Sequence, residues 1–376
     1  MDTEKLKKQL FTRTEIYAAS VGEIYRRYMM KAIELVKGVK LIEGVPFSFS
    51  EYGYGDEATK LFREMYSTLY QFIKTNMEKE FNLAHKHNDD LIKSVFGAKA
   101  IEDNHYAKYF KRNSEALDQM FARKSAKGGL NLSQRVWKYT SSYKEELEAA
   151  LELAIGEGTS ANKMGSQIQK YLNDPDKFYR RFRVKVGENP DGTPKYGRQW
   201  KRRVFDKETK VYKWVNDNPK KYNPGQGVYR SSARNAQRLA RTQTNIAYRE
   251  ADLDRWSQLD FIVGYEIRRS NNPYPCDVCE GLKGKYPKNF KWSGWHPNCR
   301  CHMIPIMASQ EEIEDQIERI LTGDDEQISN SKNAVDDLSI EFKKWIRENE
   351  ERLNRSTSLP YFISDNREAI NKILKK

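Results

Sequence analysis

Apolar residues in the N-terminal third of the chain recur at three- or four-residue intervals, a spacing that predicts amphipathic helices. One helix is expected over 13–37 and a second over 57–81, separated by a loop rich in glycine, serine and tyrosine. A third helix is expected over 103–124. His85 and His87 would then lie at the polar end of the second helix as exposed imidazoles. Residues 1–130 are therefore predicted to form a helical arm or bundle.

The spacing of apolar residues changes twice in the middle of the chain. Helical spacing over 132–155 and 161–173 gives way to strict alternation at 178–186, which indicates a strand. Two further alternating runs, 199–205 and 210–215, flank a short polar turn and predict a β-hairpin. A long helix then follows, capped by Ser231 or Ser232. Beyond it, strands are expected at 261–268 and 300–306.

The last segment returns to helical spacing. Ser309 and Glu312 form a capping-box signal at the start of one helix, and another helix is expected over 334–354 with its apolar stripe in a core. The predicted fold class is α+β and mainly helical, with one small antiparallel sheet in its central domain. The predicted domains are a helical N-terminal region (1–130), an α+β domain (131–308) and an acidic helical C-terminal region (309–376). The α+β domain would contain a basic β-hairpin insert at about 177–230 and a Cys/His loop at 273–301.

Charge is unevenly distributed along the chain. The net charge is +13, yet residues 177–230 hold sixteen Lys/Arg against five Asp/Glu, whereas residues 309–376 hold eleven against sixteen. A basic segment with interleaved aromatic residues suits a polyanion such as nucleic acid, because cations neutralise phosphates and rings stack on bases. A solvated charged surface without a partner accounts equally well for the charge alone. The candidate nucleic-acid contacts are Arg180, Arg181, Arg183, Lys201, Arg202, Arg203 and Lys213.

All four cysteines lie within 26 residues of this 376-residue chain, in a C-x2-C pair and a later H-x2-C-x-C block. Such spacing of soft ligands is typical of a tetrahedral structural zinc site. Two disulfides or free buried cysteines are the alternatives, and the absence of a secretory signal at the N-terminus disfavours disulfides. His302 would point away on a strand. The candidate ligands, of which four would bind, are Cys276, Cys279, His296, Cys299 and Cys301.

The residues Arg238-Leu239-Ala240-Arg241-Thr242-Gln243, the pair Cys276 and Cys279, and the block His296-Pro297-Asn298-Cys299-Arg300-Cys301 resemble the Mu F-like domain. That domain defines the phage minor head, or head morphogenesis, proteins. The resemblance covers about residues 132–307, and the block ending at Cys301 is its specific part. Arg241 and Thr242 match the family's helical motif, whereas Gln243 stands where the family commonly has an acid.

The resemblance implies a minor capsid protein of a tailed phage or prophage that acts in head morphogenesis at the portal and in DNA packaging or ejection. The implied partners are the portal, capsid or scaffold proteins and packaged DNA. The implied location is the virion interior after synthesis in the host bacterial cytoplasm. No apolar run is long enough to span a membrane.

Two other functions fit the residues. One is a zinc-dependent nuclease or toxin-like enzyme, and the other is a zinc-stabilised DNA-binding protein unrelated to virions. We expect no enzyme, because the ligands would be used for structure and the sequence lacks an HExxH motif, a nucleotide-binding glycine loop and a Ser/His/Asp constellation.

Overall fold

The computed structural model describes most of the chain, and for some residues inside helices and strands it describes the backbone alone. The described residues are 3–42, 45–113, 115–125, 128–156, 161–173, 179–206, 211–216, 229, 231–270, 276–324, 328, 331–356 and 358–374.

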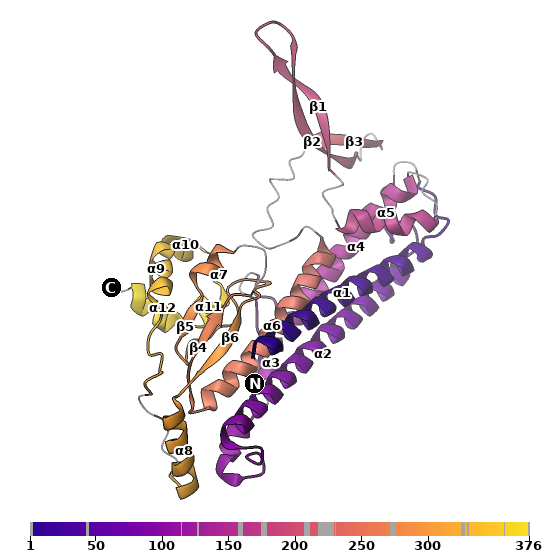
Figure 1. Ribbon diagram of the computed structural model, residues 1–376. Helices are drawn as coiled ribbons and strands as arrows, with labels where there is room; N and C mark the ends of the chain where they lie inside the picture. The colour runs from indigo at the N-terminus through magenta and orange to yellow at the C-terminus, as the bar shows by residue number, and fades with distance from the viewer. Residues whose placement is uncertain are drawn as a thin grey trace. The chain divides into compact units, whose positions relative to one another are not determined.

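The fold is mainly helical with small antiparallel sheets, which confirms the predicted α+β class (Figure 1). The helices are α1 (Thr3–Leu35), α2 (Gly55–Phe96), the 3-10 helix η1 (Asn104–Phe110), α3 (Ala116–Ala122), α4 (Leu132–Gly156), α5 (Ala161–Asn173), α6 (Ser232–Gln258), α7 (Asp277–Gly281), α8 (Gln310–Thr322), α9 (Ile340–Glu348), α10 (Glu350–Arg355), α11 (Tyr361–Ser364) and α12 (Arg367–Leu374). The strands are β1 (Tyr179–Glu188), β2 (Pro194–Asp206), β3 (Val211–Asn216), β4 (Ile262–Arg268), β5 (Gly284–Tyr286) and β6 (His302–Met307).

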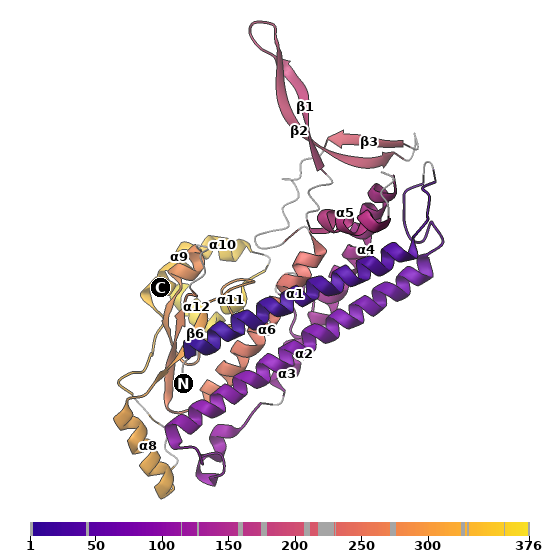
Figure 2. The same ribbon diagram turned by 45° about the vertical axis from the view of Figure 1, so that its right-hand side comes forward.

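The chain divides into two compact units, and each is assembled from separate stretches of sequence. The first unit comprises 1–17, 72–133 and 239–376, and the second comprises 18–71 and 134–238. Helices α1, α2 and α6 pass from one unit into the other. In both views α1 and α2 run side by side (Figures 1 and 2), so each unit contains one part of this helix pair.

The second unit is a helical assembly with an inserted sheet. Tyr25 of α1 and Tyr143 of α4 meet edge to face, with ring centroids 4.5 Å apart, and both side chains are buried. Glu146 of α4 accepts hydrogen bonds from the backbone N and the hydroxyl of Ser232, the first residue of α6. Strands β1, β2 and β3 pair antiparallel in that order, which confirms the predicted strand and hairpin.

The first unit contains the second sheet, in the order β5-β4-β6, and its main core. Aromatic side chains join this sheet to the C-terminal helices: Tyr286 of β5 lies edge to face with Phe342 of α9, and Trp295 lies edge to face with Phe362 of α11. Figure 1 shows α9 and α12 gathered beside this sheet. The predicted core role of the last apolar stripe is confirmed, since Phe342 and Ile346 are fully buried.

Buried polar contacts connect the helices within the first unit. Lys7 of α1 forms a buried ion pair with Asp252 of α6 at 2.8 Å, and Asn88 of α2 donates to the same carboxylate at 3.0 Å. Arg13 forms a bidentate ion pair with Glu80. Its Nε and Nη2 atoms lie 2.6 and 2.8 Å from the two carboxylate oxygens of Glu80. Charged groups inside a protein require such partners, so these pairs fix how α1, α2 and α6 meet in this unit.

Four predicted helix boundaries are wrong. Helix α1 begins at Thr3, ten residues before the predicted start at residue 13. Helix α2 continues to Phe96, so His85 lies inside it and is fully buried rather than exposed. The helix expected over 103–124 is instead η1 and α3. The backbone is extended at Lys111, between the two helices, and the carbonyl oxygen of Lys111 accepts a hydrogen bond from Arg255 at 2.8 Å instead of one from a helical N–H. The helix expected over 334–354 begins only after Ser339, because Val335 N bonds to Val263 O beside β4.

Candidate metal centre

The five predicted ligands are brought together in the first unit. Cys276 is the N-cap of α7 and Cys279 lies within that short helix. His296 and Cys299 belong to the loop after β5, and Cys301 directly precedes β6. Their side-chain donor atoms form two overlapping groups: Cys276, Cys279 and His296, and Cys279, Cys299 and Cys301. Within each group the donor atoms lie within 4.8 Å of one another.

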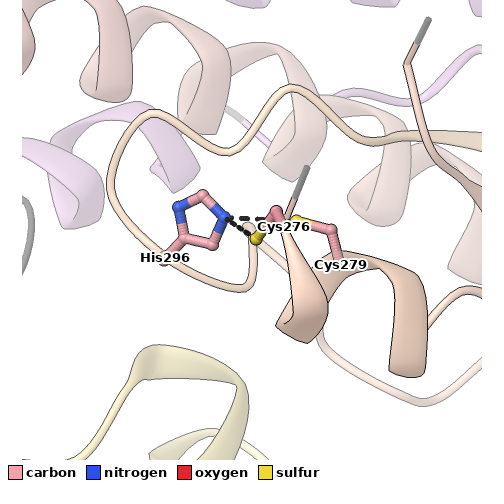
Figure 3. Close-up of side chains that lie close together, drawn as sticks. All are labelled: Cys276, Cys279 and His296. Atoms are coloured by element: carbon pink, nitrogen blue, oxygen red, sulfur yellow. Dashed lines mark hydrogen bonds between the residues drawn. The ribbon is translucent and has the colours of Figure 1, made fainter. Parts of the chain in front are cut away.

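The distances in the cluster fit a small tetrahedral ion. The sulfurs of Cys276 and Cys279 lie 3.3 and 3.2 Å from His296 Nε2 (Figure 3), and the sulfurs of Cys279 and Cys299 are 3.9 Å apart. Ligands on one tetrahedral zinc are separated by about 3.5 to 3.8 Å, given Zn–S and Zn–N bonds of about 2.3 and 2.0 Å. The cluster can therefore hold a metal ion, with Cys279 belonging to both groups.

The ring of His296 is oriented for ligation through Nε2. Its Nδ1 atom lies 2.8 Å from the carbonyl oxygen of Pro297. A carbonyl oxygen only accepts, so Nδ1 carries the proton and Nε2 presents its lone pair to the two sulfurs. This is the usual way in which a second hydrogen bond fixes the tautomer of a ligating histidine.

A buried guanidinium supports the loop that carries the later ligands. Arg249 of α6 donates to the carbonyl oxygens of Ser293, Cys299 and Cys301 at 2.8, 2.7 and 2.8 Å. It also lies over the ring of Trp292, with 4.6 Å between the guanidinium carbon and the ring centroid. Burial lowers the pKa of Arg249, and the neighbouring Cys299 and Cys301 sulfurs oppose that shift. Arg249 thus places a buried cation beside the thiols.

Two residues of the loop have backbone conformations that restrict which residue can stand there. Gly294 has φ of +134°, and a Cβ at this position would lie 2.8 Å from Nη1 of Arg249. Asn298 has φ of +65°, in the left-handed region that asparagine tolerates better than most residues. These conformations turn the loop so that His296 and Cys299 both reach the cluster.

The thiols differ in acidity. Burial alone would raise the pKa of Cys299, but hydrogen bonds from Cys279 and Cys301 and the charge of Arg249 lower it well below its ordinary value. Hydrogen bonding to the sulfurs of Cys299 and Cys301, together with burial, raises the pKa of Cys279. Cysteine binds a metal as the thiolate, so an ion in this cluster would displace protons from thiols.

The helical motif and the H-P-N-C-R-C block also meet in this unit. Asn298 N donates to the hydroxyl of Thr242 at 3.2 Å. Glu15 of α1 accepts from Arg241 through one carboxylate oxygen and from Arg300 through the other. One arginine from each of the two segments, Arg241 and Arg300, therefore binds the same acid, and the hydroxyl of Thr242 accepts a hydrogen bond from the backbone of the other segment.

The remaining predicted site residues are not at this centre. His302 belongs to neither ligand group, as expected for a strand residue facing away. The backbones of Arg180, Arg181 and Arg183 lie on β1, those of Lys201, Arg202 and Arg203 on β2, and that of Lys213 on β3. The side chains of these seven residues lie outside the part of the chain that the structure describes.

No family model, curated protein or solved structure matches this chain. Among the described residues, none of the helices combines the length and the apolar run that a bilayer span requires.

The sequence interpretation gave no role to Arg249 or Glu15. A signal for Arg249 exists in the spacing of α6, where Thr242, Asn245, Arg249, Asp252 and Trp256 recur at three- or four-residue intervals and form a stripe that includes buried polar residues. No local signal marks Glu15, because its partners lie 226 and 285 residues away in the sequence.

Proposed function

We propose that this chain is a minor head protein of a tailed phage or prophage, which acts in head morphogenesis at the portal. The observation that carries the proposal is the contact between the two segments that resemble the Mu F-like domain, residues 238–243 and 296–301. They meet through the hydrogen bond between Asn298 and Thr242 and through the shared Glu15. Motif residues that are far apart in sequence but meet around one site are expected when they define one domain. Two chance similarities would have no reason to meet.

We propose that the cluster holds zinc in a structural role. The two ligand groups found among the described residues consist of cysteine and histidine alone, and their soft donors suit zinc. A catalytic zinc keeps one position for water and needs a general base nearby. Five donors for a four-coordinate ion leave no such position, so the ion would tie α7, the loop and the start of β6 together.

The charge of Arg249 favours a ligand set of three thiolates and His296. Three thiolates and a neutral imidazole on a divalent ion carry a net charge of −1, which the buried guanidinium beside them balances. Four thiolates would leave a net charge of −2. Buried charges are stable when compensated, so the one positive charge of the buried Arg249 supports the mixed set.

The basic hairpin supports a place next to packaged DNA. Residues 177–230 carry most of the excess positive charge of the chain, and the described part of them forms an antiparallel sheet. A cationic sheet inserted in a portal-associated protein would contact the genome during packaging or ejection.

The proposal is tested in particles of the phage or prophage that encodes the chain. The protein would be quantified by mass spectrometry in nuclease-treated full heads and in heads emptied of DNA. We expect a few copies per portal in full heads. A fall after DNA release would identify an ejected protein, and an unchanged amount would identify a fixed head component.

Complete absence of the protein from full heads would contradict the proposal. The purified protein should also be incubated with duplex DNA and Mg²⁺ or Zn²⁺. Cleavage that is lost in His296→Ala but kept in His302→Ala would favour the zinc-nuclease alternative. DNA binding without cleavage, by a protein absent from particles, would favour the DNA-binding alternative.

A further inference from the structure

The five candidate ligands of the cluster divide into two groups of three. Cys276, Cys279 and His296 form one, which we call the outer group, and Cys279, Cys299 and Cys301 form the inner group. Among the residues that the structure describes, neither Cys276 nor His296 is grouped with Cys299 or Cys301, so Cys279 is the donor that the two groups share. Donors on one tetrahedral zinc would all lie about 3.5 to 3.8 Å apart. The cluster therefore offers two adjacent centres that share one sulfur.

The two centres differ in their access to water. In the outer group Cys276 is half-buried and His296 is exposed, and His296 Nε2 lies 3.3 and 3.2 Å from the sulfurs of Cys276 and Cys279 (Figure 3). In the inner group all three cysteines are buried. Arg249 donates to the backbone carbonyls of Cys299 and Cys301 and so fixes the inner group in place. An ion in the inner group would be enclosed, whereas an ion in the outer group would stay open to exchange.

The number of donors suits two three-coordinate ions. A four-coordinate zinc uses four of the five donors and leaves one thiol without a metal. Two three-coordinate ions use all five, because a thiolate sulfur has more than one lone pair and Cys279 can bridge them. Such a pair of ions would leave none of the gathered donors unused.

The chemistry of the donors selects the kind of ion. Soft thiolate ligands favour zinc and Cu(I). Zinc in a group of three protein donors would keep a fourth position for water, whereas Cu(I) is satisfied by three soft donors. Two Cu(I) ions also repel each other about a quarter as strongly as two Zn²⁺ ions at the same separation, since the energy follows the product of the charges. A pair of ions that share one sulfur is therefore expected to be monovalent.

We propose that the cluster binds two Cu(I) ions, one in each group, with the sulfur of Cys279 bridging them. This metal load goes beyond the structural zinc, and its starting state, the zinc form with three thiolates and His296, rests on the proposed function. In the exchange two Cu(I) ions enter, one Zn²⁺ leaves, and the thiol that zinc does not use gives up its proton, with no transfer of electrons. Four thiolates and two Cu(I) ions carry a net charge of −2, which Arg249 offsets in part at the inner group and water screens at the outer group.

The test is a copper titration of the zinc-loaded full chain. Cu(I) would be supplied as its acetonitrile complex in the absence of oxygen. Mass spectrometry of the desalted protein counts the bound copper, and a chromogenic chelator measures the zinc that is released. We expect two Cu(I) ions bound and one zinc released per chain at saturation. A competing Cu(I) chelator should then remove the two ions in separate steps, the ion of the exposed outer group first.

Two substitutions within the C-x2-C pair give matched variants. Cys276→Ser removes a donor from the outer group alone and should keep one Cu(I) ion that resists the chelator. Cys279→Ser removes a donor from both groups and should weaken the binding of both ions at least about tenfold, the smallest loss typical of even an outer-shell change at a metal site. His296→Ala, an exposed change, should behave as Cys276→Ser does and replaces Cys279→Ser as the test if circular dichroism shows that variant to be unfolded. His302→Ala is the control and should bind both ions.

Saturation at one Cu(I) ion per chain would overturn the proposal, as would equal copper binding by Cys276→Ser and Cys279→Ser. The zinc content measured before copper is added separates this result from the structural role of zinc. One zinc and one Cu(I) would keep that role and refute the pair of Cu(I) ions. Two Cu(I) ions bound by a protein that takes up no zinc would refute the structural zinc and support the shared sulfur.

Discussion

Arg249 donates a hydrogen bond to the carbonyl oxygen of Cys301 at 2.8 Å, from a helix that supplies none of the five candidate ligands. The same guanidinium reaches the carbonyls of Cys299 and Ser293. One buried side chain thereby fixes the backbone on both sides of the second thiol pair. The centre therefore depends on α6 as well as on its ligands.

Arg249→Met should destabilise the zinc-loaded protein by about 3 to 5 kcal/mol, because it leaves three buried carbonyls without donors and the thiolates without a cation. Arg249→Lys should recover only part of this loss, since an ammonium group cannot donate hydrogen bonds to three carbonyls in the planar geometry of the guanidinium. Urea unfolding with excess zinc measures the free energy, and competition with a chromogenic chelator measures zinc affinity. Arg234→Met, an exposed change on the same helix, is the control. Unaltered stability and zinc affinity in Arg249→Met would refute this role.

His296→Ala should weaken metal binding, whereas His302→Ala should not. Of the two histidines, His296 presents a ring nitrogen to the sulfurs of Cys276 and Cys279, and His302 belongs to neither ligand group among the described residues. The measurement is the absorption spectrum of the cobalt-substituted protein, in which sulfur-to-metal bands report the thiolates and visible bands report tetrahedral geometry. His302→Ala should keep the wild-type spectrum. If His296→Ala also keeps that spectrum and its affinity, the ion is held by the four sulfurs instead.

Removal of the ion should loosen the aromatic core around the loop. Trp292 and Trp295 are both buried, and their rings lie 5.5 Å apart between centroids in the loop that the ion would hold. A strong chelator should therefore shift tryptophan emission to longer wavelength, and added zinc should reverse the shift. Trp292→Phe should reduce the change. A chelated protein with unchanged emission and unchanged unfolding temperature would show that the ion does not stabilise this core.

Asn298→Gly should be tolerated and Asn298→Ala should not. The left-handed φ of +65° costs an ordinary L-residue about 1 to 2 kcal/mol but costs glycine nothing of this kind. The backbone N–H that bonds to Thr242 is kept in both variants, so the comparison isolates backbone strain. Thermal unfolding of the zinc-loaded proteins measures the difference. Equal stability of the two variants would contradict the strained conformation.

The second unit should lose stability as the pH rises from about 4.5 to about 7. Burial raises the pKa of Glu146 to about 7, and the hydrogen bonds from Ser232 and the charge of Glu145 modify that shift. The folded protein thus binds a proton that the unfolded chain, with a pKa near 4.5, releases. This contribution is full below pH 4.5 and is lost between there and about pH 7, at up to about 1.4 kcal/mol per pH unit.

Glu146→Gln tests this dependence because glutamine resembles the protonated acid. The variant should match the wild type near pH 4 and exceed its stability near pH 8, in urea unfolding followed by circular dichroism. Any effect of pH on the metal centre is common to both proteins, so the difference between them is the quantity to measure. Glu145→Gln, an exposed neighbour, should show no such trend. A constant difference between wild type and Glu146→Gln would refute the raised pKa.

The amino-acid sequence by itself determined the features that depend on residues close together in the chain. The five metal-ligand candidates were found from spacing, because C-x2-C and C-x-C pairs hold their sulfurs together with little help from the rest of the fold. The capping box at Ser309 and Glu312 is present as predicted, since both of its hydrogen bonds are local. The alternation at 178–186 and in the hairpin likewise identified the strands.

Tertiary structure decided everything that depends on partners far away in the chain. Helix α2 continues past residue 81 because Asn88 and Asp89 have partners on α6, Asp252 and Arg255 respectively, and no local signal indicated these contacts. Arg249 and Glu15 acquire roles only when their elements are brought beside the cysteine loop. Helical and strand periods report which side of an element is buried, but they do not specify what it is buried against, because that choice is made by long-range packing.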